Sequence, residues 1–194
     1  MTLTVADELC ERLASDLDGT FAELMAAHED LVFGVALRVV GDHAAAQDAF
    51  QDAFIRAYRA LRRYPSERIR ELRPRPWLAR IALNAARNHV RARRPTEDVS
   101  TVLESQLTAE TGDPPRIAER RADRAMWGRL LTALPDRYGV AVALRYVDGL
   151  SYAELAETLN RPIGSVKSDV HRGTQLLRAA YDAEQRAIAR EEAV

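Results

Sequence analysis

The sequence has a single cysteine and no long apolar run, and both absences narrow the class of protein. Cys10 cannot form a disulfide within the chain, and one thiol cannot build a cysteine-rich zinc site. No stretch of about 18 apolar residues occurs, and the first residues carry acids where a signal peptide carries bases. We therefore expect a cytoplasmic protein in a reducing compartment, with an unreactive thiol and no membrane insertion.

Glycine, proline and aromatic residues are also scarce. The 194 residues include 9 glycines and 8 prolines, and only 6% of them are aromatic. Alanine, leucine and arginine dominate, and these residues have good helix propensity. The predicted fold class is therefore all-α. The apolar share of 47% is enough for one sizeable core or two small ones.

The chain lacks the sequence signatures of an enzyme. It has no nucleophile elbow, no phosphate-binding glycine loop and no metal-ligand spacing. His28 and His43 lie too far apart in helical phase to share a metal ion. We expect no catalytic residue, no cofactor, no bound metal and no small-molecule substrate.

The near-zero net charge of −1 hides a strong sorting of charge along the chain. Residues 1–55 hold 2 bases and 11 acids, whereas residues 56–95 hold 13 bases and 2 acids. Residues 96–115 hold 5 acids and no base, and residues 116–194 are nearly balanced. An arginine-rich block of this density repels itself unless a polyanion or an acidic protein face lies opposite, so nucleic acid is the natural partner. A merely solvated surface is the alternative.

The acidic stretch between Pro95 and Pro115 has weak periodicity and several turn-forming residues, which is typical of a flexible linker. It predicts two small helical domains joined by that linker. The expected organisation is an acidic N-terminal extension at 1–19, a first domain at 20–95, the linker at 96–115, a second domain at 116–180 and a charged helical tail at 181–194.

The first domain shows helical periodicity with clear boundaries. Apolar residues recur at three- and four-residue steps from Phe21 to Val39, and Gly41 ends this helix. Asp42 can cap a second helix that runs to Leu61 and whose aromatic stripe is expected in the core.

A proline- and arginine-rich segment, residues 65–76, follows the second helix. Its prolines predict irregular backbone, and a third helix is expected from Trp77, whose ring is expected in the core. The outer face of that third helix is basic and amide-bearing, and it carries Arg80, Asn84, Arg87, Asn88, Arg91 and Arg94.

The second domain contains a predicted helix-turn-helix. Ser151 and Glu154 form a capping box that places a helix at about 152–159. A four-residue turn at 160–163 then leads into a further helix from about 164 to 180. Short polar and basic groups occupy the leading end of its outer face, which is the arrangement that lets such a helix enter the major groove of DNA. They are Ser165, Lys167, Ser168, His171 and Arg172.

Three stretches together resemble the extracytoplasmic-function (ECF) sigma factors of the sigma-70 family. Residues 44–61 and 77–94 resemble the family's second domain, and residues 134–178 resemble its fourth domain. The resemblance implies an alternative sigma factor that binds core RNA polymerase, recognises the minus-35 and minus-ten elements of promoter DNA and promotes transcription initiation. It also implies an anti-sigma factor as a partner.

The resemblance assigns residues to three faces. The polymerase-binding face comprises Asp48, Gln51, Asp52 and Arg56. The minus-ten face comprises Arg68, Arg70, Arg73, Arg80, Asn84, Arg87, Asn88 and Arg91. The minus-35 face comprises Arg161, Ser165, Lys167, Ser168, His171 and Arg172.

The chain departs from the family pattern at four positions. Asp169 and Thr174 stand where the family usually has arginines, Gly139 occupies a position that is often basic, and Gln47 replaces a usual glutamate. The Asp169 carboxylate is expected either to accept a hydrogen bond from a cytosine amino group or to lower the affinity for phosphate.

A helix-turn-helix repressor or activator is the competing interpretation, because residues 150–178 alone fit it. Such a regulator is usually a dimer that reads a two-fold site, and it leaves residues 44–94 unexplained. An interaction protein without a DNA role requires the basic faces to be coincidental.

Overall fold

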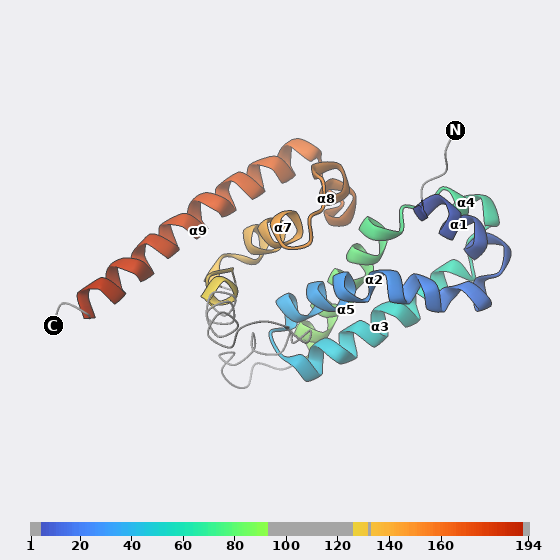
Figure 1. The fold of residues 1–194 in the computed structure, drawn as a ribbon, viewed down its shortest axis with the longest axis horizontal. Helices are drawn as coiled ribbons and strands as arrows, with labels where there is room; N and C mark the ends of the chain where they lie inside the picture. The colour runs from blue at the N-terminus through green and yellow to red at the C-terminus, as the bar shows by residue number, and fades with distance from the viewer. Residues whose placement is uncertain (1–4, 93–125, 132, 192–194) are drawn as a thin grey trace, which may run out of the picture. The chain divides into compact units, whose positions relative to one another are not determined.

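The computed structural model describes residues 5–92, 126–131 and 133–191, and this part of the chain is helical without strands (Figure 1). The predicted all-α class is therefore confirmed. The chain divides into two compact units, the first holding α1–α5 and the second holding α7, α9 and most of α8. The helices are α1 (Val5–Ser15), α2 (Leu17–Val40), α3 (His43–Leu61), α4 (Ser66–Arg70), α5 (Pro74–Ala92), α7 (Asp136–Tyr146), α8 (Tyr152–Leu159) and α9 (Ile163–Glu191). The predicted linker, 96–115, lies outside the described residues.

The core of the first unit lies where α2, α3 and α5 pack against one another. Gly41 ends α2 in the left-handed conformation, at a φ of 72°, and its N–H donates to Leu37 O at 2.9 Å. Asp42 caps α3, because its Oδ2 accepts from Ala45 N–H at 2.8 Å. Both predicted boundaries are therefore confirmed. Alanines on α3 and α5 let the three helices approach closely, and Trp77 is buried among them, as predicted.

The N-terminal region forms the helix α1, which the sequence pattern does not predict. Leu9 and Leu13 of α1 are buried, and this helix packs against α2 and α4. Ser66 Oγ donates to Ala14 O at 3.3 Å and so ties the start of α4 to α1. Although α1 is rich in acidic residues, it also has an apolar stripe. This stripe packs against α2 and α4 and so holds α4 in place.

The prediction of irregular backbone across 65–76 is wrong. Ser66–Arg70 is helical, and α5 begins at Pro74 rather than Trp77. The physical reason is that the first turn of a helix has no intrahelical acceptor for its N–H groups, so Pro74 and Pro76 cost nothing there.

The second unit is built on the packing of α7 against α9. The two helices approach closely at Gly173, where an added Cβ would lie 2.5 Å from Val142 Cγ2. Leu144, Leu150 and Leu155 are buried. Val147, the residue that follows α7, is 61% exposed.

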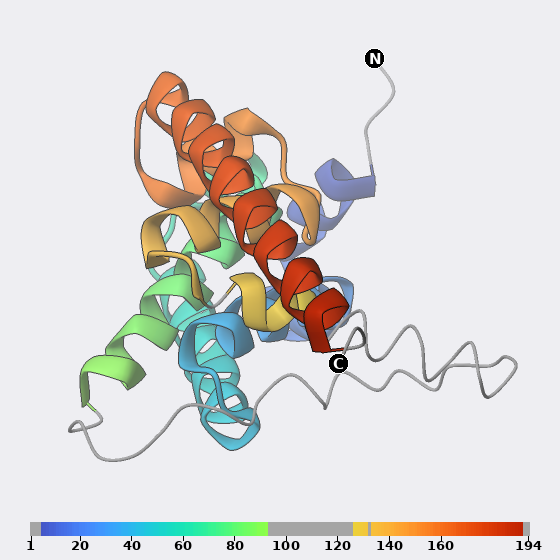
Figure 2. The same cartoon turned by 90° about the vertical axis from the view of Figure 1, so that its left-hand side faces the viewer.

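Helix α9 runs on to Glu191 as one uninterrupted helix (Figure 2). It is longer than the predicted helix at 164–180, and residues 181–191 of the predicted charged tail continue it without a break. The ring of Tyr181 stacks on Trp127, with ring centroids 5.1 Å apart and planes 10° apart. Arg129 and Glu184 form an ion pair at 3.2 Å one turn further on.

Candidate nucleic-acid interface

Helices α8 and α9 form the predicted helix-turn-helix. The capping box is present, because Ser151 N–H donates to Glu154 Oε2 at 2.8 Å and Glu154 N–H donates to Ser151 Oγ at 3.2 Å. Asn160 adopts a φ of 50° in the turn, and Arg161 N–H donates to Ala156 O at 3.0 Å. Asparagine tolerates this left-handed conformation better than most residues, so it allows the chain to reverse within four residues.

One side of α9 is buried and the other is open. Val166 and Val170 are buried, whereas Lys167, Ser168 and His171 are exposed. Arg172 is exposed on the same side, and Ser165 is half-buried near the helix start. The structure thus brings together the predicted minus-35 residues of α9 on its leading turns.

The side chain of Asp169 is buried in the second unit. Its side chain is 1% exposed, and its Oδ1 accepts from Arg137 Nε at 2.8 Å and lies 2.7 Å from Arg137 Nη2. Its Oδ2 accepts from Nη1 of Arg161, a predicted minus-35 residue in the turn. Of the two expected roles of Asp169, the hydrogen bond from a cytosine amino group is wrong, because its carboxylate is enclosed between two arginines of its own domain. A lower affinity for phosphate stays a prediction.

The charge state of Asp169 follows from these partners. Burial by itself raises the pKa of the carboxyl, but the hydrogen bonds and positive charges of Arg137 and Arg161 outweigh it. The net result is a pKa below the ordinary value. Asp169 is therefore ionised at neutral pH.

Two other departures have structural accounts. The Thr174 hydroxyl donates to Val170 O at 2.8 Å, within its own helix. Gly139 is buried, and an added Cβ there would lie 2.8 Å from Leu131 O, so a longer side chain requires the backbone to shift.

In the first unit, the outer face of α5 presents amides and arginines as predicted. Asn84, Asn88 and Arg91 are exposed, and Arg80 and Arg87 are half-buried. Arg94 lies outside the described residues. The exposed groups supply hydrogen-bond donors of the kind that bind phosphates and unpaired bases.

The arginines of α4 are partly engaged within the protein. Arg68 lies over the ring of Tyr64, 3.7 Å from its centroid. Arg70 Nε donates to both carboxylate oxygens of Glu11 on α1, at 3.0 Å each. Arg73, which follows α4, is exposed.

The predicted polymerase-binding residues lie on α3. Asp48 and Gln51 are exposed. Asp52 Oδ2 accepts from Arg56 Nε at 2.8 Å and lies 3.9 Å from His89 Nε2 on α5. This face is polar and charged, and the charges of Asp52 and Arg56, one turn apart, partly neutralise each other.

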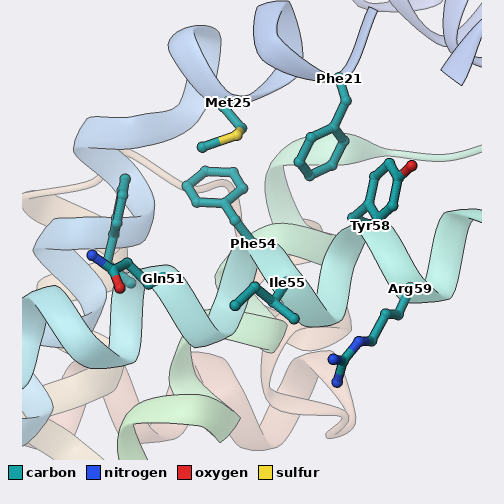
Figure 3. Close-up of a pocket in the computed structure, with 8 residues that line it drawn as sticks. Phe21, Met25, Gln51, Phe54, Ile55, Tyr58 and Arg59 are labelled. Atoms are coloured by element: carbon teal, nitrogen blue, oxygen red, sulfur yellow. The ribbon is translucent and has the colours of Figure 1, made fainter. Parts of the chain in front are cut away.

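An open apolar groove of about 370 Å³, which the sequence pattern does not predict, lies beside this face, between α2 and α3. Figure 3 shows the side chains of Phe21 and Met25 from α2 meeting those of Phe54 and Tyr58 from α3. The aromatic stripe is thus partly accessible instead of wholly in the core. The signal in the sequence for this groove is Ile55, an apolar residue on the polar side of α3. It is 48% exposed in the structure. The groove is lined by Phe21, Met25, Phe50, Gln51, Phe54, Ile55, Tyr58 and Arg59.

The fold and these faces define a helical, two-unit DNA-binding protein with a helix-turn-helix. The family model of Sigma-70 region 2 matches residues 24–96, and that of Sigma-70, region 4 matches residues 124–177. The ECF RNA polymerase sigma factor SigW of Bacillus subtilis is 31% identical over 81% of this chain and 87% of its own length. The RNA polymerase sigma-H factor of Pseudomonas aeruginosa is 31% identical over 88% and 90%. The chain belongs to the ECF sigma factors of the sigma-70 family.

Solved structures share the fold. CnrH in complex with the cytosolic domain of CnrY has a TM-score of 0.68 at 23% identity, and the match covers 93% of this chain and 99% of that one. The sigma factor RpoE of Bartonella quintana, in complex with the anti-sigma factor NepR, has a TM-score of 0.63 at 18% identity and covers 86% and 97%. The predicted function, an alternative sigma factor in promoter recognition and transcription initiation, is confirmed by the family models and the relatives.

Proposed function

We propose that this sigma factor reads the minus-35 element with the outer face of α9, captures the minus-ten element with α5 and the basic segment 65–76, and binds core polymerase through α3. One observation carries the minus-35 assignment. Lys167, Ser168, His171 and Arg172 are exposed on the leading turns of α9, whose opposite side is fixed in a core. A helix held in this way can enter the major groove.

The side chains on α9 differ in what they can recognise. Lys167 and Arg172 donate to guanine acceptors or to phosphates, while Ser168 and His171 can donate or accept. Each good base contact contributes roughly 1–3 kcal/mol of discrimination. Only Nη1 of Arg161 donates to Asp169, so the other N–H groups of its guanidinium can donate to a phosphate.

The first unit has the groups needed to hold a separated strand. Extruding a base costs a few kcal/mol, and phosphate contacts together with a pocket offset that cost. The side chains that can contact such a strand are the exposed ones on α5, namely Asn84, Asn88 and Arg91. Trp77 cannot stack on a base, because its ring is buried in the core.

The partners follow from the same assignment. The sigma factor acts in the cytoplasm with core polymerase and promoter DNA, and it has no catalytic activity of its own. Among the described residues, none of the helices combines the length with the apolar character that a membrane span requires. An anti-sigma factor is a further partner, which is supported by the two solved complexes with the cytosolic domain of CnrY and with NepR.

Two substitutions test the assignment of faces. Arg172→Ala should lower promoter-specific initiation by about tenfold through lost minus-35 discrimination while core polymerase binds as before. Asp48→Ala should weaken polymerase binding while the minus-35 preference of the remaining holoenzyme is unchanged. The measurements are run-off transcription and fluorescence anisotropy with core polymerase. Loss of both properties in either variant would contradict the separation of the two faces.

A further inference from the structure

Asp169 combines two properties that conflict unless it has a structural task. It lies within the DNA-reading helix between Ser168 and Val170, yet its charged side chain is 1% exposed. Burying an ionised carboxylate is costly unless its charge and its hydrogen bonds are matched. Arg137 and Arg161 supply this matching from two different places in the chain.

Asp169 lies at the edge of the buried side of α9. At about 100° per residue, position 169 is about 60° from Val166, which is buried, and about 60° from Arg172, which is exposed. Its orientation is set by its contacts, because its side chain is 1% exposed and its carboxylate is bound by Arg137 and Arg161. A carboxylate held in this way is not available to a base while the three side chains stay together.

The three side chains tie together three parts of the second unit. Arg137 lies in the first turn of α7, Arg161 lies in the turn of the helix-turn-helix, and Asp169 lies on α9. Arg137 is 54% exposed and Arg161 is 31% exposed at the side chain, so the carboxylate is the enclosed member of the triad. Removing it leaves two neighbouring cations without the group that holds them.

We propose that Asp169 is a positioning residue for minus-35 recognition: it fixes the orientation of the outer face of α9 relative to α7, and it orients Arg161 in the turn. This inference rests on the proposed function of α9. It assigns to Asp169 an indirect effect on promoter choice, exerted through the triad and without any contact to DNA.

The test uses the full chain reconstituted with core polymerase, on a promoter identified by run-off transcription with the wild-type holoenzyme. The measured quantity is minus-35 discrimination, defined as the ratio of initiation from the intact promoter to that from a template with the minus-35 element replaced. Asp169→Asn keeps the size of the side chain and removes its charge. We expect it to lower this ratio by about tenfold while affinity for core polymerase stays within about twofold.

A substitution on α7 separates positioning from a direct contact. Arg137→Gln removes one of the two cations that hold Asp169 and leaves Asp169 and the outer face of α9 unchanged. We expect it to lower minus-35 discrimination. We also expect the double variant with Asp169→Asn to lose no more discrimination than Asp169→Asn alone, because the two groups act through one contact. If Asp169 instead contacted a base directly, Arg137→Gln would leave the ratio unchanged.

The outcomes distinguish the inference from the function on which it rests. If Arg172→Ala leaves the ratio unchanged, the proposed role of α9 is wrong. If Arg172→Ala lowers it but Asp169→Asn does not, only the positioning role is wrong. If Asp169→Asn does not fold, as judged by circular dichroism, Arg137→Gln decides. Lowered discrimination in a folded Arg137→Gln variant supports the proposal, and an unchanged ratio overturns it.

Discussion

The side of a helix on which a residue lies decides whether its functional group can reach a reagent or a ligand. Cys10 and Asp169 both show this. Cys10 is 1% exposed on α1, and its Sγ–H donates to Leu72 O at 3.5 Å. Burial, and then the nearby negative charge of Asp7, raise the pKa of the thiol above its ordinary value. The reactive thiolate is therefore scarce at neutral pH.

We predict that Cys10 resists alkylation while the protein is folded. Iodoacetamide at neutral pH should label it at least about tenfold more slowly than in denaturant, as followed by intact-mass spectrometry. A free thiol peptide provides the rate for an unprotected cysteine. Labelling of the folded protein at the peptide's rate would show that α1 is not docked as described.

The ion pair between Glu11 and Arg70 leads to a second prediction at this scale. The carboxylate of Glu11 accepts two hydrogen bonds of 3.0 Å from the guanidinium of Arg70, a predicted minus-ten residue. Exposed pairs of this kind contribute about 0–1 kcal/mol, so Arg70 can exchange Glu11 for phosphate at small cost. Glu11→Gln should therefore raise holoenzyme affinity for a minus-ten fork template by up to about fivefold.

The matched control is Glu67→Gln, because Glu67 lies further from Arg70, at 3.9 Å. Its effect in the same anisotropy titration should be smaller. Weaker binding of Glu11→Gln than of wild type would mean that Glu11 helps to place Arg70 for DNA and does not compete with it.

At the scale of elements, the second unit depends on the close approach of α7 and α9. A Cβ at Gly173 would lie 2.5 Å from Val142 Cγ2 and 3.1 Å from Tyr138 O. Gly173→Ala should lower the free energy of unfolding by about 1–3 kcal/mol, because the overlap outweighs the better helix propensity of alanine. Urea unfolding followed by circular dichroism measures this.

Gly164 provides the control for that experiment, because a Cβ there meets nothing within 4 Å. Gly164→Ala should leave the stability unchanged or raise it by up to about 1 kcal/mol. Equal effects of the two substitutions would contradict the packing of α7 on α9.

The helices that the sequence predicts well are those whose ends carry their own signals. Gly41, Asp42 and the Ser151–Glu154 capping box act within four residues, so their effect can be judged locally. Helix α1 was missed because its acids dominate the local composition, and the start of α5 was misplaced because prolines in a first turn look like breaks. The roles of Asp169 and of the groove depend on residues that are distant in sequence, and periodicity does not show which apolar face is covered.

At the scale of the whole molecule, charge is sorted to match the proposed division of labour. Residues 1–55 carry a net charge of −9 and residues 56–95 a net charge of +11. The acids of α1 and α3 lie in the first segment, and the arginines of α4 and α5 lie in the second. We expect a polyanion to be attracted to the second segment more strongly than to the first.

The central claim is that this chain is a sigma subunit, and competition for core RNA polymerase tests it most directly. Fluorescence anisotropy of the labelled, purified protein is measured with core polymerase at physiological salt, with a housekeeping sigma factor as competitor. We predict tight one-to-one binding that the competitor displaces. Absence of binding to core polymerase, together with dimeric binding to DNA, would contradict the account.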